Sequence, residues 1–338
     1  TGVDDVQGES DPYFHFGSIK EIKANIASKV DKFNTYVNPN IAPFVDAGEN
    51  YSIPIATPFV LTGTATDEDT NDILTYAWEQ IDNGVSHFDN FSPLKYSGPV
   101  FRSHLPTTSN KRYLPNVERV IQNKLLESNP VLTFDNTSWE TLSNFPRSYK
   151  FALTVRDRSF DDASSGRGQV SYDSIQINVV NTDGPFSINS QSSEVTVAEG
   201  SIQTVTWNVA GTDQAPINVS KVNILLSTDG GYNYDHVLVQ NIANNGIHEV
   251  FIPISDAENT IETSNARIKV EAVGNIFYAI NESPIIIEKS DFIFVPDSSI
   301  KQVCLEAPFK EAVYNLKYTP TAGFSDEVIF GSENRPDG

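Results

Sequence analysis

The chain has 338 residues, of which 39% are hydrophobic and 11% aromatic. That length and composition predict two or three folded domains and exclude disorder throughout the chain. The formal net charge is -21, from 44 acidic and 23 basic residues, which excludes the basic footprint of a nucleic-acid-binding protein. The only cysteine is Cys304, so no intrachain disulfide holds the fold, and no apolar run approaches the ~20 residues of a transmembrane helix.

An amphipathic helix is predicted within residues 1–37. Ser18 and Glu21 have the spacing of a capping box, in which each side chain bonds to the backbone N–H of the other residue. Apolar residues then recur on one helical face: Ile19, Ile22, Ile26, Val30 and Phe33. This stripe has to be covered, either by a sandwich of this chain or by a partner that the chain lacks.

Residues 38–183 are predicted to form a β-sandwich. After a proline-containing linker, apolar residues alternate with other residues in short segments, which is the pattern of half-buried antiparallel strands. The alternating residues are Phe59, Leu61, Leu74, Tyr76, Trp78, Tyr149, Phe151, Leu153, Val155, Ile175, Ile177 and Val179. An insertion at about 84–148, with a short helix predicted after Asn116, is expected to be ordered and to pack on the sandwich.

A second strand series occupies residues 184–289. It contains about seven alternating segments in roughly a hundred residues, which is the number in one immunoglobulin-like sandwich. Residues 290–338 have only three or four such segments, so they predict an incomplete third sandwich. The predicted fold class is therefore mainly β: tandem immunoglobulin-like or PKD-like sandwiches with one N-terminal helix and a partly helical insertion.

Catalytic signatures are absent from the sequence. His248-Glu249 is not followed by a second histidine one turn later and lies in an alternating segment, so it cannot form the two-histidine zinc motif of metalloproteases. The five histidines have no metal-ligand spacing, and no Gly-x-Ser-x-Gly nucleophile elbow occurs. We therefore predict neither a zinc site nor an enzymatic activity within this chain.

Two groups of aspartates are the best ligand candidates. Asp67, Asp69 and Asp72 lie in a turn between two predicted strands, and Asp157 and Asp161 follow a third. Both turns are expected at one end of the sandwich, where their carboxylates supply several of the six to eight oxygens that Ca²⁺ prefers. The alternative is that these are solvated turns whose aspartates bond only to nearby backbone groups.

Three other features favour structural roles. The run Ser227–Tyr234 resembles an Asp-box hairpin, in which Asp229 bonds to the turn backbone and an aromatic residue packs beneath. Trp78 and Trp207 lie in strand alternation and are expected in cores, whereas the place of Trp139 in the insertion stays open. Asp173-Ser174-Ile175 matches a short bacterial O-glycosylation pattern, which makes Ser174 a candidate acceptor.

Long runs of this sequence resemble the region that follows the catalytic domain in reprolysin-like zinc metallopeptidases of Bacteroidetes. The runs are Asp11–His15, Val45–Gly48, Thr57–Asp67 (TPFVLTGTATD), Leu74–Gln80 (LTYAWEQ), Gly98–Ser103, Leu105–Thr108, Arg112–Asn116, Phe151–Asp157 (FALTVRD), Gln203–Thr212 (QTVTWNVAGT) and Asp291 to Ser325. The resemblance implies that residues 1–37 hold the last catalytic-domain helix and that PKD-like or cadherin-like and Ig-like modules follow. It also implies export by the type IX secretion system. None of the family's zinc ligands falls within this chain, and His15 resembles a family position that is not a ligand.

Three functions are compatible with these patterns. The first is a non-catalytic accessory region of a secreted zinc metalloendopeptidase, for spacing, stabilisation, or binding of a protein substrate or a surface. The second is a Ca²⁺-dependent cell-surface adhesion or matrix protein with no protease attached. The third, carbohydrate binding, requires an exposed aromatic platform and is contradicted if Trp139 is buried and no glycan binds. The first two place the chain outside the cell.

Overall fold

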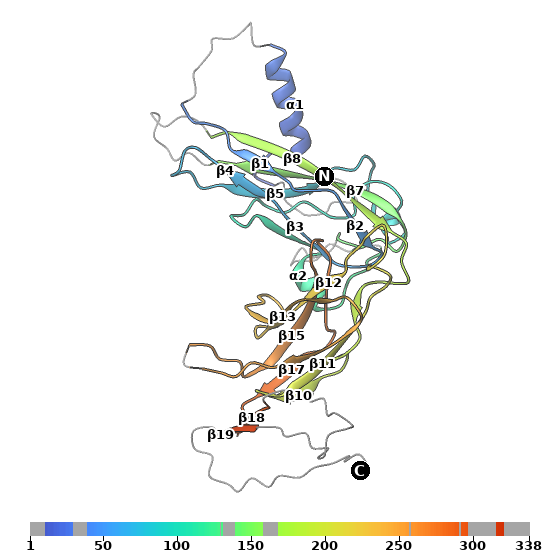
Figure 1. The fold of residues 1–338 in the computed structure, drawn as a ribbon. Coiled ribbons are helices and arrows are strands. Elements are labelled where there is room, and N and C mark those ends of the chain that lie inside the picture. Colours follow the sequence, from blue (N-terminus) through green and yellow to red (C-terminus); the bar gives the residue numbers. More distant parts are fainter. Residues whose placement is uncertain are drawn as a thin grey trace, which may run out of the picture.

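The computed structural model describes residues 11–29, 39–128, 130, 139–157, 168–256, 258–290, 292–296 and 316–320. The fold is mainly β: two β-sandwiches follow one another along the molecule, and helix α1 (Phe16–Ala27) stands at the far end of the first (Figure 1). The predicted fold class is confirmed. Within the described residues, no helix is both long enough and apolar enough to span a bilayer.

The first sandwich has a four-stranded sheet in the order β2-β8-β7-β5, with two strand pairs, β1-β4 and β3-β6, opposite it. The bounds of these strands are β1 Phe44–Asp46, β2 Tyr51–Pro54, β3 Phe59–Thr62, β4 Thr64–Thr66, β5 Thr75–Gln80, β6 Lys111–Leu114, β7 Arg147–Arg156 and β8 Val170–Val180. The side chains at the predicted alternating positions of β3, β5, β7 and β8 point toward the core. The Phe59 ring packs across the two layers against the rings of Tyr149 and Phe151, with ring centroids 6.0–6.2 Å apart.

The insertion is ordered where it is described, and it contributes to the sandwich itself. Its strand β6 pairs with β3, which the sequence pattern did not reveal. A short 3-10 helix, η2 (Phe88–Asn90), and the predicted helix α2 (Val117–Ile121) also form. Helix α2 begins after Asn116, whose side chain accepts the N–H of Glu118 at 3.3 Å, because Asn favours this capping position.

Helix α1 docks on the outer face of the four-stranded sheet. It begins at Phe16, so the capping box predicted at Ser18 is wrong: His15 is the N-cap, and no side chain of the helix caps it. The Phe16 N–H instead donates to the Glu79 carboxylate of β5 at 2.8 Å. Ile19 is buried, as the stripe predicted, but Ile22 and Ile26 are exposed because the helix rises away from the sheet (Figure 1). Val30 and Phe33 lie outside the described residues.

The second sandwich has a five-strand path, β10-β17-β15-β12-β13, with β16 attached to β15, and it faces the three-stranded sheet β14-β11-β9. The bounds are β9 Ser187–Ile188, β10 Val195–Ala198, β11 Ile202–Asn208, β12 Lys221–Ser227, β13 His236–Ala243, β14 Ile247–Phe251, β15 Thr263–Ala272, β16 Tyr278–Ile280 and β17 Ile285–Glu288. The sequence pattern predicted about seven of these nine strands and missed the short β9 and β16. Beyond them, β18 (Phe292–Pro296) pairs with β19 (Leu316–Pro320).

The two sandwiches share one strand arrangement. In the first, β2 runs parallel to the last strand, β8, with Tyr51 opposite Ile177. In the second, β10 runs parallel to the last strand, β17, with Val195 opposite Ile285. The remaining pairings within both sandwiches are antiparallel. In each module the second strand therefore lies beside the last one, while the short first strand, β1 or β9, pairs in the other layer.

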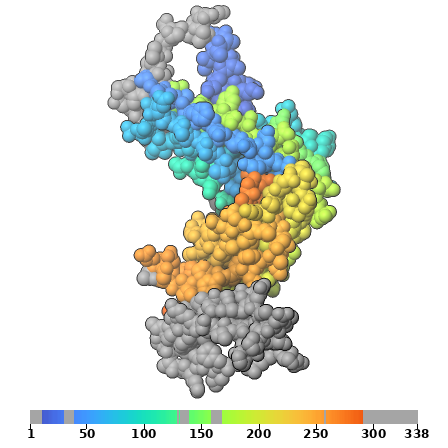
Figure 2. Space-filling view, viewed as in Figure 1, coloured from blue at the N-terminus to red at the C-terminus, as the bar shows by residue number. Residues whose placement is uncertain are grey.

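The turn between β15 and β16 locks the two sandwiches together. Val60 N–H of the first sandwich donates to the Ile276 carbonyl at 2.9 Å, and Tyr278 N–H donates to the Pro58 carbonyl at 3.0 Å. Between these bonds Phe277 is fully buried, and both sandwiches contribute to one continuous apolar core. In Figure 2 this orange segment is set between the blue surface of the first sandwich and the yellow surface of the second. The junction is thus a packed interface and not a free linker.

Candidate cation site and the polar network of the insertion

The acidic turn between β4 and β5 lies beside the end of β7. Asp69 N–H donates to the Asp67 carboxylate at 2.9 Å, and Asp72 N–H donates to the Asp69 carbonyl at 3.0 Å, so local bonds shape the turn. Because β5 pairs with β7, with Thr75 opposite Arg156, the turn is brought next to Asp157. One carboxylate oxygen each of Asp67, Asp72 and Asp157 lies within 4.8 Å of the other two.

Asp157 has its hydrogen bonds, but those of Asp67 and Asp72 are incomplete. Asp157 is 4% exposed, and its two oxygens accept the Gln169 N–H at 2.5 Å and the Asn40 side-chain amide at 3.0 Å. One oxygen of Asp67 and one of Asp72 are buried without any donor. A buried carboxylate oxygen without a donor is costly, and a cation placed among the three groups would satisfy it.

The electrostatics of the cluster favour a bound cation. Burial and the charges of Asp67 and Asp69 raise the pKa of Asp72. Burial also raises the pKa of Asp157, against the hydrogen bonds from Gln169 and Asn40 that lower it. The donor set consists of carboxylate oxygens, which suits a hard cation such as Ca²⁺ and not zinc, which prefers nitrogen and sulfur.

The five aspartates named from the sequence do not all converge. Asp67, Asp72 and Asp157 meet, as their position at one end of the sandwich predicted. Asp69 stands outside this trio, and its carboxylate accepts the N–H of Ile41 at 2.7 Å. Asp161 lies outside the described residues.

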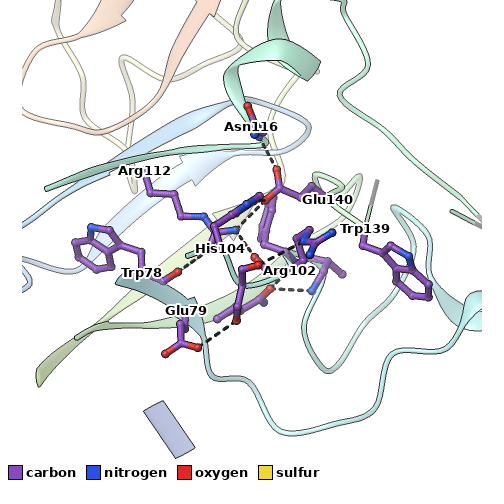
Figure 3. A network of polar contacts seen from close by, with 12 residues as sticks. Trp78, Glu79, Arg102, His104, Arg112, Asn116, Trp139 and Glu140 are labelled. Atoms are coloured by element: carbon purple, nitrogen blue, oxygen red, sulfur yellow. Dashed lines mark hydrogen bonds and ion pairs between the residues drawn. The ribbon is translucent and has the colours of Figure 1, made fainter. Parts of the chain in front are cut away.

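A second polar centre, which the sequence pattern did not reveal, lies in the insertion (Figure 3). Glu140 is 0% exposed, and its carboxylate accepts bonds from the His104 ring at 2.9 Å, from Arg112 at 2.8 Å and from the Asn116 N–H at 2.5 Å. Burial alone would raise the pKa of Glu140, but these donors and positive charges lower it to about 2. Arg112 also bonds to the carbonyl of Trp78, so the network ties the insertion to β5.

A third centre attaches the N-terminal segment. Glu79 is buried on the outer face of β5 and accepts bonds from the His15 ring at 2.5 Å and the Ser103 hydroxyl at 3.2 Å. The hydrogen bond to Glu79 raises the pKa of His15. Arg156 donates to the Phe14 carbonyl at 2.7 Å. The Tyr13 hydroxyl donates to the His104 carbonyl at 3.0 Å, so β5, β7 and the insertion together hold the segment before α1.

The remaining sequence candidates are placed as follows. Trp139 is 4% exposed and packs against Phe91 at 5.2 Å, so it offers no exposed platform for sugar stacking. Asp229 accepts the N–H groups of Tyr232 and Asn233 at 3.2 and 2.9 Å, as an Asp-box turn predicts. The Tyr232 ring is exposed, whereas Tyr234, the other aromatic residue of the run, is half-buried with its hydroxyl buried against Gly231 of the turn. Ser174 is exposed on β8.

Comparison with known proteins gives matches among solved structures only. No protein-family model and no curated protein matches the sequence. The structural matches include the tandem Ig repeats of Dlar, at 7% identity over 73% of this chain and 98% of that chain, with a TM-score of 0.34. The Ig1-2 module of the Drosophila receptor protein tyrosine phosphatase DLAR matches at 9% identity over 73% and 100%, with a TM-score of 0.33. Drosophila N-cadherin EC1-4 matches at 12% identity over 73% and 50%, with a TM-score of 0.21. At such identities no function passes from these proteins to this chain.

Proposed function

We propose that the chain is a non-catalytic binding region of an extracellular protein, with a Ca²⁺ site formed by Asp67, Asp72 and Asp157. The observation that carries the proposal is the approach of three carboxylates to within 4.8 Å of one another, with two buried oxygens that lack donors. Water and backbone oxygens would complete the coordination, because Ca²⁺ takes six to eight oxygen ligands.

The site has a structural consequence for the N-terminal segment. Asn40, which precedes β1, bonds to Asp157, and the Ile41 N–H bonds to Asp69. The Gln169 side chain also donates to the Asn40 carbonyl. A cation that fixes the Asp157 and Asp69 loops would therefore also fix the chain that leads into the first sandwich.

Calorimetric titration of the whole chain with CaCl₂, and with MgCl₂ for comparison, tests the site. At free Ca²⁺ a hundredfold above the dissociation constant, binding to the native state should stabilise by about 2.7 kcal/mol and raise the melting temperature accordingly. Asp72→Asn should abolish the rise in melting temperature that Ca²⁺ causes, whereas Asp235→Asn, at an exposed aspartate of the second sandwich, should leave this rise unchanged. A melting temperature that is the same in CaCl₂ and in EGTA would refute the site.

The resemblance to the region after reprolysin-like catalytic domains supports a narrower proposal. In this proposal the modules belong to a secreted zinc metalloendopeptidase, where they space or stabilise the catalytic domain or bind its protein substrate or a surface. The bonds from Glu79 and Arg156 that dock α1 and the residues before it support this narrower proposal. Such docking would give a domain that precedes α1 a fixed attachment to the first sandwich. A Ca²⁺-dependent adhesion or matrix protein is the alternative, and the same cation site favours it.

The mass and N-terminal sequence of the protein secreted by its source distinguish these two proposals. A larger species whose upstream sequence contains His-Glu-x-x-His-x-x-Gly-x-x-His would support the protease, and proteolytic activity would be assayed next. A native product that begins at Thr1 would contradict the protease proposal and support an adhesion module that works alone.

A further inference from the structure

A cavity of about 280 Å³ lies between β5 and the segment of the insertion that leads into β6 and α2. Two backbone hydrogen bonds between Tyr76 and Thr107, at 2.7 and 3.0 Å, hold one wall. The Trp78 indole N–H donates to the Asn110 carbonyl at 3.1 Å and holds the other. These bonds fix the walls before any ligand arrives, which lowers the entropic cost of binding.

The cavity is distinguished by the charges that line it. His104, Lys111 and Arg112 line it, and no carboxylate does. Two other cavities lined by described residues, of about 540 and 960 Å³, contain carboxylates such as Asp157 and Glu79. Glu140 bonds to both Arg112 and His104 from behind the lining and balances the charge of Arg112, so the positive charge that this cavity offers to a ligand is that of Lys111.

The three bases differ in how strongly they are held. Arg112 has a side chain that is 9% exposed and bonded to the carbonyls of Trp78 and Arg102 as well as to Glu140, so it forms a fixed wall. His104 shares the same Glu140 carboxylate at 2.9 Å. Lys111 is exposed at the rim, and no hydrogen bond or ion pair of its ammonium group occurs among the described residues.

The other lining groups indicate the kind of ligand. Tyr113, Leu105 and Val117 provide apolar surface, and the hydroxyls of Thr107 and Ser109 lie beside it. Trp78 is only 3% exposed, so no open indole face is offered to a sugar ring. A volume near 280 Å³ is at the lower end of ligand cavities and suits one side chain with its flanking backbone.

We propose that this cavity binds a carboxylate-bearing side chain, Asp or Glu, of a partner polypeptide. Lys111 provides the ion pair at the rim. Arg112 forms the fixed wall behind it, with its charge balanced by Glu140 (Figure 3). The binding is independent of the cation site, because the two sites share no residue. Chelation of Ca²⁺ should therefore leave it intact.

The test uses the isotope-labelled whole chain and two blocked dipeptides, acetyl-Glu-Phe-amide and its isosteric counterpart acetyl-Gln-Phe-amide. The Glu peptide should shift the backbone amide resonances of Thr107, Lys111 and Tyr113 saturably and bind at least fivefold more tightly than the Gln peptide in low salt. The difference should shrink at 0.5 M NaCl, because a rim ion pair is screened.

A pair of lysine variants makes the test specific. Lys111→Gln, at an exposed strand residue, should fold normally and weaken the Glu peptide at least threefold. Lys150→Gln removes the same charge beside a cavity that contains carboxylates and should leave the affinity unchanged. Equal affinity for both peptides, shifts elsewhere in the chain, or no effect of Lys111→Gln would overturn the proposal. Shifts at these amides with sodium glucuronate and not with the Glu peptide would overturn the assignment to a polypeptide.

Discussion

Replacing Glu140 by glutamine should destabilise the first sandwich more than any loss of a surface charge. Glu140 is fully buried, and its carboxylate balances Arg112 and bonds to His104 and the Asn116 N–H. Glu140→Gln keeps the size of the side chain but removes the negative charge, so the buried Arg112 guanidinium is left without its counter-charge. Breaking one side of a buried ion pair in this way costs about 3–5 kcal/mol.

The pKa of Glu140 gives an independent magnitude. A pKa lowered from its ordinary value of 4.5 to about 2 in the folded state corresponds to about 3 kcal/mol of stability from the ionised form, at 1.36 kcal/mol for each unit. Because the folded pKa lies below the unfolded one, this stability is present above about pH 4.5. It is lost as the pH falls toward 2, since the proton then binds in both states.

Thermal unfolding followed by tryptophan fluorescence at pH 7 measures the effect. A loss of about 3 kcal/mol in a unit of this size lowers the melting temperature by roughly 6–12 °C. Glu249→Gln, at an exposed site on β14, is the matched control and should shift it by less than about 2 °C. The difference between wild type and Glu140→Gln should shrink as the pH falls from 5 to 2. A Glu140→Gln variant as stable as the control at pH 7 would show that the network contributes no net stability.

Two further changes test the docking surfaces. Phe277→Ala should lower the free energy of unfolding by about 3–5 kcal/mol, because it empties the centre of the junction. Solution scattering should then show a wider range of angles between the two sandwiches. Phe251→Ala, at an exposed phenylalanine of β14, should have neither effect, and a Phe277→Ala variant with wild-type stability and scattering would contradict the packed junction. Ile19→Asp should release α1 and speed proteolytic cleavage near it about tenfold or more, because burial of this side chain holds the helix. Ile22→Asp, on the exposed part of the same stripe, should leave the cleavage rate unchanged, and equal rates for both variants would mean that the helix is held by its polar contacts alone.

The sequence predicted best what depends on local patterning. Alternating apolar residues identified β7 and β8, because each inward position of a strand has to be apolar when one face is buried. Ala152 and Thr154, at the outward positions of β7, are buried too. They lie opposite Glu79 and Tyr172, which contact Phe16 at the start of α1. Their burial could not be expected without knowing where the helix docks.

What the sequence did not predict depends on partners far away in the chain. The start of α1 is set by Glu79, 63 residues beyond Phe16, and not by the local capping box at Ser18. Strand β6 forms because β3 offers it a free edge, which its own four residues do not signal. In the acidic turn, Asp69 bonds to Ile41 and stands outside the trio, a choice made by tertiary contacts and not by spacing.

The parallel pairing of the second and last strands in each sandwich has a mechanical consequence. Once the short strand before it, β1 or β9, has separated from its partner, a pull on the two ends of a module draws β2 against β8, or β10 against β17, in opposite directions along their length. The hydrogen bonds of a parallel ladder then carry the load together in shear, and they do not open one after another as in a hairpin that is peeled from its end. Two such modules in series, joined at a packed junction, would transmit tension along the chain with little extension.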